Sequence, residues 1–269
     1  MNIKKVGLLA GVGKLPVECA RVAKQIGLDV AAVALLPDTD QTLKDYVNDY
    51  IDINAGQLEA ILSYLKEKQV THVTMLGKVT KEYLFSGQLQ PDARMMQLVM
   101  SAPDHKDDTM MLLFVRELEN AGMQVLDQTI LVRELFPKQG TLTSRVPTEA
   151  ERRDIAYGLE VARELGRLDI GQTVVVKDMA VMALEAIEGT DACIKRGCEL
   201  ARQDAVVVKV EKLKQDNRFD VPTVGLNTIE VMVQGGAKVL ALEAGKTLLV
   251  DREKVIQLAD EHGIAIEAV

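Results

Sequence analysis

Short apolar segments alternate with helix-spaced segments over residues 1–133, and this alternation limits the possible fold more than any other feature of the chain. The apolar segments are typical of strands that are buried on both faces of a sheet. Strands are expected at Val6–Ala10, Val30–Leu36, His72–Leu76 and Met123–Leu126. Helices are expected between them at Leu15–Ile26, Gln57–Gln69, Pro91–Met100 and Asp107–Ala121. This order predicts an α/β fold with a Rossmann-like, parallel N-terminal domain.

The periodicity is lost between Phe136 and Pro147, where two prolines, one glycine and three Ser or Thr residues occur. Such a segment is typical of a linker. We therefore expect an N-terminal domain at 1–133, a linker at 134–147 and a C-terminal domain at 148–269. The C-terminal domain should begin with a helix, because Thr148 and Glu151 form a capping-box pattern.

The second half mixes strands and helices in a different order. Thr173–Val176 and Ala180–Glu185 are separated by three residues and predict a hairpin. Val239–Leu242 and Thr247–Val250, on either side of a Gly-Lys pair, predict a second hairpin. The remaining expected elements are strands at Ala205–Val210 and Ile264–Ile266 and helices at Asp191–Leu200 and Arg252–His262. The C-terminal domain should therefore be of the mixed α+β type.

The charge balance excludes some classes of function. The chain has 40 acidic and 32 basic residues, a net charge of −8, and only 3 % aromatic residues. A broad basic face or a stacking platform for nucleic acid is therefore not expected. No uncharged apolar stretch reaches the ~18 residues that a transmembrane helix needs. Three cysteines without a CxxC pattern indicate a reducing compartment.

The first candidate site is the glycine-rich turn after the first strand. Gly11 and Gly13 would let a phosphate or a sugar approach the backbone where the next helix begins at Leu15. A nicotinamide dinucleotide fits less well, because Pro16 replaces the third small residue and no acid ends the second strand. A tight turn without a ligand is the structural alternative.

The second candidate is the acidic stretch from Glu185 to Asp191. Carboxylates that lie between a strand end and a helix start can converge on one hard cation. Alternatively, Thr190 caps the helix and Asp191 interacts with the helix dipole. That alternative leaves Glu185 and Glu188 unexplained.

The third candidate is the segment Gln215–Pro222, where Asp216 and Asp220 flank Arg218. Carboxylates in such a loop suit metal binding or general-base work, and an arginine can bind a phosphate with two hydrogen bonds. A solvated turn is the alternative, because Asp, Asn and Pro are ordinary turn residues.

Several motifs together resemble one family. They are GLLAGVGKLP near the N-terminus, Gly77-Lys78-Val79, DIGQTVVV, EAIEGTDACIKR, KQDNRFDVPTVG and ALEAGKTLLVDRE. The sequence is similar to the LpxI-type UDP-2,3-diacylglucosamine pyrophosphatases of lipid A biosynthesis. The resemblance implies two domains that hold a lipid-linked sugar between them. It also implies Mg²⁺-dependent hydrolysis to UMP and 2,3-diacylglucosamine 1-phosphate (lipid X), with Asp216 or Asp220 as the essential acid.

The residues and the resemblance together give one working hypothesis, a Mg²⁺-dependent diphosphate hydrolase in which Mn²⁺ could replace Mg²⁺. The predicted site residues are metal ligands Glu188, Asp191, Asp216 and Asp220, catalytic Asp216, Asp220, Arg218 and Lys209, and substrate contacts Gly11, Gly13, Leu15, Lys78, Thr190 and Gln215. A cytoplasmic location is expected, while peripheral contact with the inner membrane and a homodimer stay open. The rival hypotheses are a nicotinamide-dependent oxidoreductase and a non-enzymatic protein that binds a lipid or a nucleotide.

Overall fold

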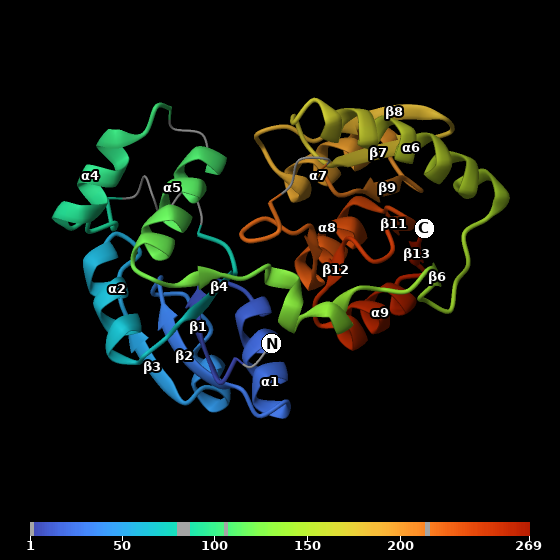
Figure 1. Cartoon of the computed structure of the whole chain (residues 1–269). Coiled ribbons are helices and arrows are strands. Elements are labelled where there is room, and N and C mark those ends of the chain that lie inside the picture. Colours follow the sequence, from blue (N-terminus) through green and yellow to red (C-terminus); the bar gives the residue numbers. More distant parts are fainter. Residues whose placement is uncertain (1–2, 80–86, 105–106, 213–215) are drawn as a thin grey trace. The chain divides into compact units, whose positions relative to one another are not determined.

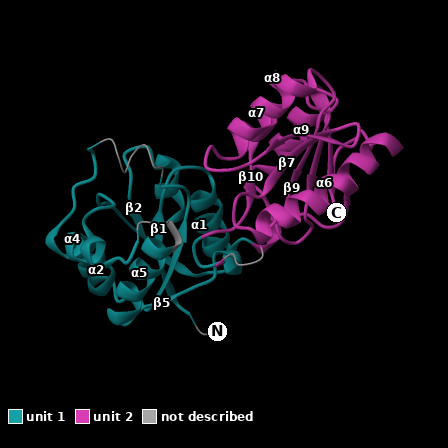
Figure 2. Cartoon of the chain, turned by 90° about the horizontal axis from the view of Figure 1, so that it is seen from above, with its two compact units in different colours: residues 1–132, 217–219 teal, residues 133–216, 220–269 magenta. Residues whose placement is uncertain are grey.

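The computed structural model describes residues 3–79, 87–104, 107–212 and 216–269 (Figure 1). The chain divides into two compact units (Figure 2). The first unit comprises Met1–Val132 together with Asn217–Phe219, and the second comprises Arg133–Asp216 together with Asp220–Val269. Each unit is an α/β structure built on its own sheet.

The first unit has a five-stranded, fully parallel sheet with the strand order β3-β2-β1-β4-β5. Its strands are β1 (Lys5–Ala10), β2 (Asp29–Ala34), β3 (Asp49–Asp52), β4 (His72–Leu76) and β5 (Gln124–Val125). The four expected strands and the Rossmann-like class are confirmed. Strand β3 was not predicted, because this edge strand is only partly buried and its sequence, DYID, has no apolar run.

Helices of the first unit begin and end close to the expected positions. They are α1 (Leu15–Gln25), α2 (Leu58–Glu67), α4 (Ala93–Ser101) and α5 (Asp107–Asn120), with 3₁₀ turns η1 (Gln41–Tyr46) and η2 (Gln128–Leu131). Leu58, Ile61, Leu62 and Leu65 of α2 are buried, as their i, i+3, i+4, i+7 spacing predicts. They pack with strand residues such as Leu9 in the core of the unit.

The second unit has a six-stranded mixed sheet with the strand order β6-β13-β11-β9-β7-β8. Its strands are β6 (Gly140–Thr141), β7 (Thr173–Lys177), β8 (Ala180–Leu184), β9 (Val206–Lys209), β11 (Val239–Leu242) and β13 (Ala265–Ala268). Strands β9, β11 and β13 run parallel, and β7 and β8 form the expected antiparallel hairpin. The mixed α+β class is therefore confirmed.

The second predicted hairpin is wrong. Strand β11 pairs in parallel with both β9 and β13, so neither of its edges is open to the segment that follows it. The chain turns away after β11, with the N–H of Thr247 donating to the carbonyl of Glu243. Strand β12 (Leu248–Leu249) then pairs in parallel with β10 (Thr223–Val224) as a separate two-stranded ladder.

Helices of the second unit are α6 (Glu149–Arg167), α7 (Thr190–Ala201), α8 (Leu226–Gly235) and α9 (Arg252–Glu261), and Arg133–Leu135 form the 3₁₀ turn η3. The capping box of Thr148 and Glu151 at the start of α6 is confirmed. Helix α8 was not predicted, because its β-branched residues and terminal glycine disfavour a helix by propensity alone. It forms because Ile229 and Met232 are buried in the core of the unit.

Residues 134–147, the expected linker, include β6, which pairs with the last strand of the sheet. The N–H of Leu142 donates to the carbonyl of Ile266. The N–H of Ile266 in turn donates to the hydroxyl oxygen of Thr143. These residues are grouped with the second unit. Among the residues that the structure describes, no helix is long and apolar enough to span a bilayer.

A buried carboxylate holds the turn of the β7–β8 hairpin. Asp178 and Met179 at this turn have positive φ values of 49° and 60°. Asp154 of α6, 6 % exposed, accepts hydrogen bonds from the N–H of Asp178 at 3.0 Å and from that of Met179 at 2.7 Å. The hairpin is thereby tied to the helix that covers its sheet.

Replacing Asp154 by Ala should destabilise the protein by about 2–3 kcal/mol, because two backbone donors lose their acceptor. Asp154→Asn should fall between Ala and the original residue, since its amide group offers one acceptor oxygen. Urea unfolding followed by circular dichroism measures the difference. Glu160→Ala on the exposed face of the same helix is the control. Equal stability of all variants would contradict this role.

Candidate functional site

The carboxyl ends of β1 and β4 form the switch point of the first sheet, where strand order reverses and where such sheets bind ligands. The loops that follow these strands pair with each other through the backbone. The N–H of Val12 donates to the carbonyl of Lys78 at 2.9 Å, and the N–H of Lys78 donates to the carbonyl of Val12 at 3.0 Å. Predicted substrate contacts Gly11, Gly13 and Lys78 are thus brought together at this switch point.

The glycines of these two loops meet different structural requirements. A Cβ on Gly11 would lie 2.5 Å from the carbonyl oxygen of Lys78, and one on Gly77 would lie 2.8 Å from the carbonyl carbon of Gly11. Both are therefore required by the close approach of the two loops. Gly13, at φ +104°, has open space where its Cβ would be. Leu15 is buried as the first residue of α1, so its backbone rather than its side chain is available to a ligand.

The nicotinamide hypothesis gains no support from this loop. Strand β2 ends at Ala34, and the two residues that follow it, Leu35 and Leu36, are buried and apolar. A ribose hydroxyl therefore finds no carboxylate at the end of this strand.

A buried lysine marks the corresponding edge of the second sheet. Lys209 is the last residue of β9 and is 5 % exposed. Its ammonium group donates to the hydroxyl oxygen of Thr190 at 3.1 Å and to the carbonyl of Thr223 at 3.0 Å. A positive charge is therefore fixed where the parallel strands end.

Helix α7 begins beside this lysine. Gly189, at φ +83°, is the N-cap, and Thr190 is the first helical residue. The alternative in which Thr190 caps the helix is therefore wrong, whereas Asp191 does lie in the first turn. The Thr190 hydroxyl donates instead to Glu185, a buried carboxylate directly after β8, at 3.0 Å. The lysine and the buried carboxylate therefore both contact the first residue of the helix, at the positive end of its dipole.

Glu188 and Asp191 both have partners within the second unit. Glu188 accepts from Arg196 at 2.5 Å, and hydrogen bonds from its own backbone N–H and from Arg196 hold its pKa below the usual range. Asp191 accepts from the side-chain amide of Asn227 at 2.6 Å and from the hydroxyl of Thr228 at 3.2 Å. Asp191 therefore connects the first turn of α7 to the first turn of α8.

The segment from Asp216 to Asp220 is a turn, closed by a hydrogen bond of 3.0 Å from the N–H of Asp220 to the carbonyl of Asp216. Its central residues are held by the first unit. The carbonyl of Asn217 accepts from Gln128, and Phe219 packs against the core of that unit.

Two further residues of this segment, Arg218 and Gln215, were predicted to belong to the site. Arg218 forms an ion pair with Glu119 of α5 at 3.3 Å. Gln215 lies outside the described residues. Within the part of the chain that the structure describes, no three His, Cys, Asp or Glu side chains are grouped as a metal site.

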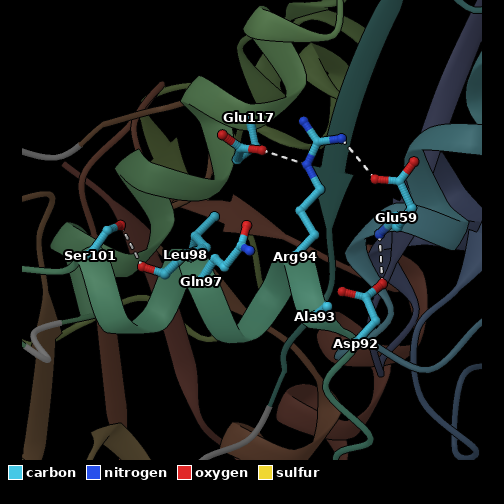
Figure 3. A pocket seen from close by; sticks show the side chains of 8 residues that line it. All are labelled: Glu59, Asp92, Ala93, Arg94, Gln97, Leu98, Ser101 and Glu117. Atoms are coloured by element: carbon cyan, nitrogen blue, oxygen red, sulfur yellow. Dashed lines mark hydrogen bonds and ion pairs between the residues drawn. The ribbon is translucent and has the colours of Figure 1, made fainter.

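A separate cleft of about 810 Å³ lies among α2, α4 and α5 of the first unit (Figure 3). Arg94 bridges its two sides through Glu59 at 2.8 Å and Glu117 at 2.7 Å. Asp92 accepts from the backbone N–H groups of Glu59 and Met95. These groups hold the helices together, and the cleft contains none of the predicted site residues.

Sequence reasoning missed two contributors to the second-unit edge. Thr173 lies opposite Lys209 in the ladder between β7 and β9, and its hydroxyl is 3.4 Å from that of Thr190. The backbone carbonyl of Thr223 is the second acceptor for Lys209. A strand register could have revealed Thr173, but a backbone acceptor leaves no signal in the sequence.

The fold and this edge define a class of protein. A buried lysine beside a helix start, at the carboxyl end of parallel strands, is typical of a site for a phosphate-bearing anion. The chain is thus a two-unit α/β protein with a buried lysine at the carboxyl end of parallel strands.

Comparison with known proteins makes the assignment specific. Residues 5–135 match the LpxI N-terminal domain and residues 138–267 match the LpxI C-terminal domain. The chain therefore belongs to the LpxI family. It is 34 % identical over 278 residues to the UDP-2,3-diacylglucosamine pyrophosphatase LpxI of Caulobacter vibrioides, covering 99 % of this chain and 98 % of that protein.

Solved structures show only distant likeness. A Rhizobium etli pyruvate carboxylase matches 71 % of this chain and 17 % of its own, at 12 % identity and a TM-score of 0.30. A Campylobacter jejuni biotin carboxylase matches 74 % of this chain and 42 % of its own, at 12 % identity and a TM-score of 0.29. Similarity at this level carries no argument about function.

Gly11→Ala should destabilise the first unit strongly, because the new methyl group would overlap the backbone of the facing loop. We expect a loss of at least about 3 kcal/mol, the scale of an overpacked or strained site. Thermal unfolding compares it with Gly225→Ala, a position with open space and negative φ, which should change little. A Gly11→Ala variant as stable as the original would mean that the loops separate easily.

Proposed function

We propose that this protein hydrolyses UDP-2,3-diacylglucosamine to UMP and 2,3-diacylglucosamine 1-phosphate (lipid X) in lipid A biosynthesis. The similarity to the Caulobacter vibrioides pyrophosphatase over 99 % of the chain carries the proposal. Water attacks the phosphorus on the sugar side of the diphosphate, the bond from that phosphorus to the bridging oxygen breaks, and UMP leaves with that oxygen. The substrate is thus a lipid-linked nucleotide sugar.

The charge at the edge of the second sheet supports a diphosphate substrate. Lys209 and the start of α7 provide positive potential that would offset charge developing on the phosphoryl oxygens. Because the lysine is buried and hydrogen-bonded before the substrate arrives, little reorganisation is needed during the reaction. In the first unit, Gly13 and Lys78 at the switch point would bind the nucleotide or the sugar.

The donor set is compatible with Mg²⁺. This ion usually takes one or two carboxylates together with phosphate oxygens of the substrate. Asp216 and Asp220, one turn apart, would supply those carboxylates. When bound, Mg²⁺ would neutralise the diphosphate and lower the pKa of water, and Mn²⁺ could replace it because it prefers similar oxygen ligands.

The remaining predicted ligands and bases have distinct places in this proposal. Glu188 and Asp191 are held by Arg196 and by the start of α8, and we expect them to shape the edge and to join the metal shell only secondarily. One of the two, Asp216 or Asp220, would also accept a proton from the attacking water. Arg218 would contact a phosphate by exchanging its bond to Glu119 for one to the substrate.

The exposed face of α4 supports an acylated rather than a free nucleotide sugar. Met96, Val99 and Met100 follow helical spacing and are 52 %, 36 % and 82 % exposed. An apolar strip of this kind suits acyl chains or the membrane that carries them. We therefore propose a cytoplasmic protein that works at the inner membrane surface.

Purified protein with Mg²⁺ should release UMP from UDP-2,3-diacylglucosamine, as measured by chromatography of the products. UDP-glucose, which lacks the acyl chains, should be a far poorer substrate, because binding energy from the chains is lost. Excess EDTA should abolish turnover, and added Mg²⁺ or Mn²⁺ should restore it. Full activity in EDTA would reject the metal-assisted route. Binding without turnover would favour the non-enzymatic rival.

Asp216→Asn or Asp220→Asn should lower kcat by about 10³-fold or more at the essential position, the scale for loss of a metal ligand or base. Substrate binding should survive, because the uridine and the acyl chains are held elsewhere. Asp38→Asn, an exposed residue of the first unit, is the matched control. Near-normal kcat in both variants would place the reacting groups outside this loop.

A further inference from the structure

A chain of hydrogen bonds links a carboxylate that the proposed reaction does not use to the lysine that it does use. Glu185 accepts from the hydroxyl of Thr190 at 3.0 Å, and this hydroxyl accepts from the ammonium group of Lys209 at 3.1 Å. The residues come from three different elements, namely the end of β8, the start of α7 and the end of β9. The chain therefore joins the parts of the second-unit edge.

The chemistry of the groups fixes the direction of these bonds. An ammonium group only donates, and an ionised carboxylate only accepts. The single proton of the Thr190 hydroxyl must then point to Glu185, while its oxygen accepts from Lys209. Thr173, 3.4 Å away, donates to the same oxygen. The Thr190 hydroxyl is thus fully committed to protein partners.

The two charged ends of this hydrogen-bond chain are both buried, which strengthens the bonds between them. Glu185 is 7 % exposed and Lys209 is 5 % exposed. The backbone of Glu185 is fixed against Gly171, where a Cβ would lie 2.2 Å from the Glu185 carbonyl oxygen. Opposite charges at the two ends of a hydroxyl polarise it, and bonds of this kind are stronger in a water-poor environment. The N–H of Gln172 also donates to the Glu185 carboxylate at 3.4 Å, so the carboxylate that receives the hydroxyl proton has a second partner in the backbone.

We propose that Glu185 is a positioning residue that acts through Thr190 to hold the ammonium group of Lys209 at the end of β9. The inference rests on the proposed function, in which Lys209 stabilises charge on the diphosphate. It assigns Thr190 to the placement of the lysine rather than to direct contact with the substrate. Misplaced charge weakens the transition state more than the ground state, so kcat should fall while KM changes little.

The experiment compares Thr190→Val, Thr190→Ser and Glu185→Gln by kinetics and by ¹H–¹⁵N spectra of the lysine ammonium groups, with Lys209→Met to assign the signal. Thr190→Val should lower kcat by about 10–100-fold and broaden or remove the Lys209 signal, since a preorganised donor is lost. Thr190→Ser should retain both, because the hydroxyl remains. Glu185→Gln should give an intermediate effect. In the Lys209→Met background, Thr190→Val should cause no further loss of kcat.

Glu243→Gln is the matched control. Glu243 follows β11 at the same edge and is 6 % exposed, but its carboxylate accepts from Arg163 and from the N–H of Glu211. This variant should leave the Lys209 signal and kcat unchanged.

Three results would overturn the proposal: no Lys209 signal in the original protein, an unchanged signal and kcat in Thr190→Val, or an equal loss of kcat in the Lys209→Met background. The spectra need no turnover. A signal that depends on Thr190 in a protein that does not hydrolyse UDP-2,3-diacylglucosamine would refute the proposed function and leave the positioning role standing.

Discussion

Parallel pairing of buried strands is the constraint on which both units depend, because it sends all five strands of the first sheet, and β9, β11 and β13 of the second, out at one edge. In the second unit, Val206, Val207 and Val208 of β9 are fully buried, and the next residue is Lys209. These valines pair with the neighbouring strands, and their side chains are buried in the core. The charged residue is the last one of the strand, where the ladder ends. In β9 the apolar side chains therefore lie within the strand and the charged one lies at its end.

Placing a lysine there has a cost in solvation, since a buried ammonium group loses its water. The structure offsets this loss with bonds to Thr190 and to the carbonyl of Thr223. Because those acceptors come from separate segments, the lysine also joins α7 and β10 to the main sheet. A single charge thus contributes to the order of the edge as well as to its chemistry.

The strands and helices that were predicted have clear apolar patterns. The strands are continuous apolar runs, and the helices have apolar residues at helical spacing. The wrong hairpin prediction arose because an apolar pattern does not say which strand pairs with which. A Gly-Lys turn after β11 looks the same whether the chain returns as a hairpin or crosses to another ladder, and only pairing with β9 and β13 decides between them.

The same limit applies to the candidate site. Lys209 and Thr190 were both named from the sequence, but their contact depends on how β9 and α7 are placed in the fold. The ion pair between Arg218 and Glu119 joins residues 99 positions apart and could not be anticipated. Residue type predicted the chemistry of these groups, whereas their pairing needed the three-dimensional structure.

The loop from Asp216 to Asp220 is divided between the two units, and this affects any attempt to express them as separate polypeptides. Its middle, Asn217–Phe219, is counted with the first unit, while the aspartates on either side are counted with the second. The polypeptide therefore passes from one unit to the other three times. Cutting the gene at the single boundary near residue 132 would give one half without the aromatic ring that completes its core and another half with an unanchored loop. Halves cut there would each keep a sheet, but Asn217–Phe219 would be divided from the unit with which they are counted.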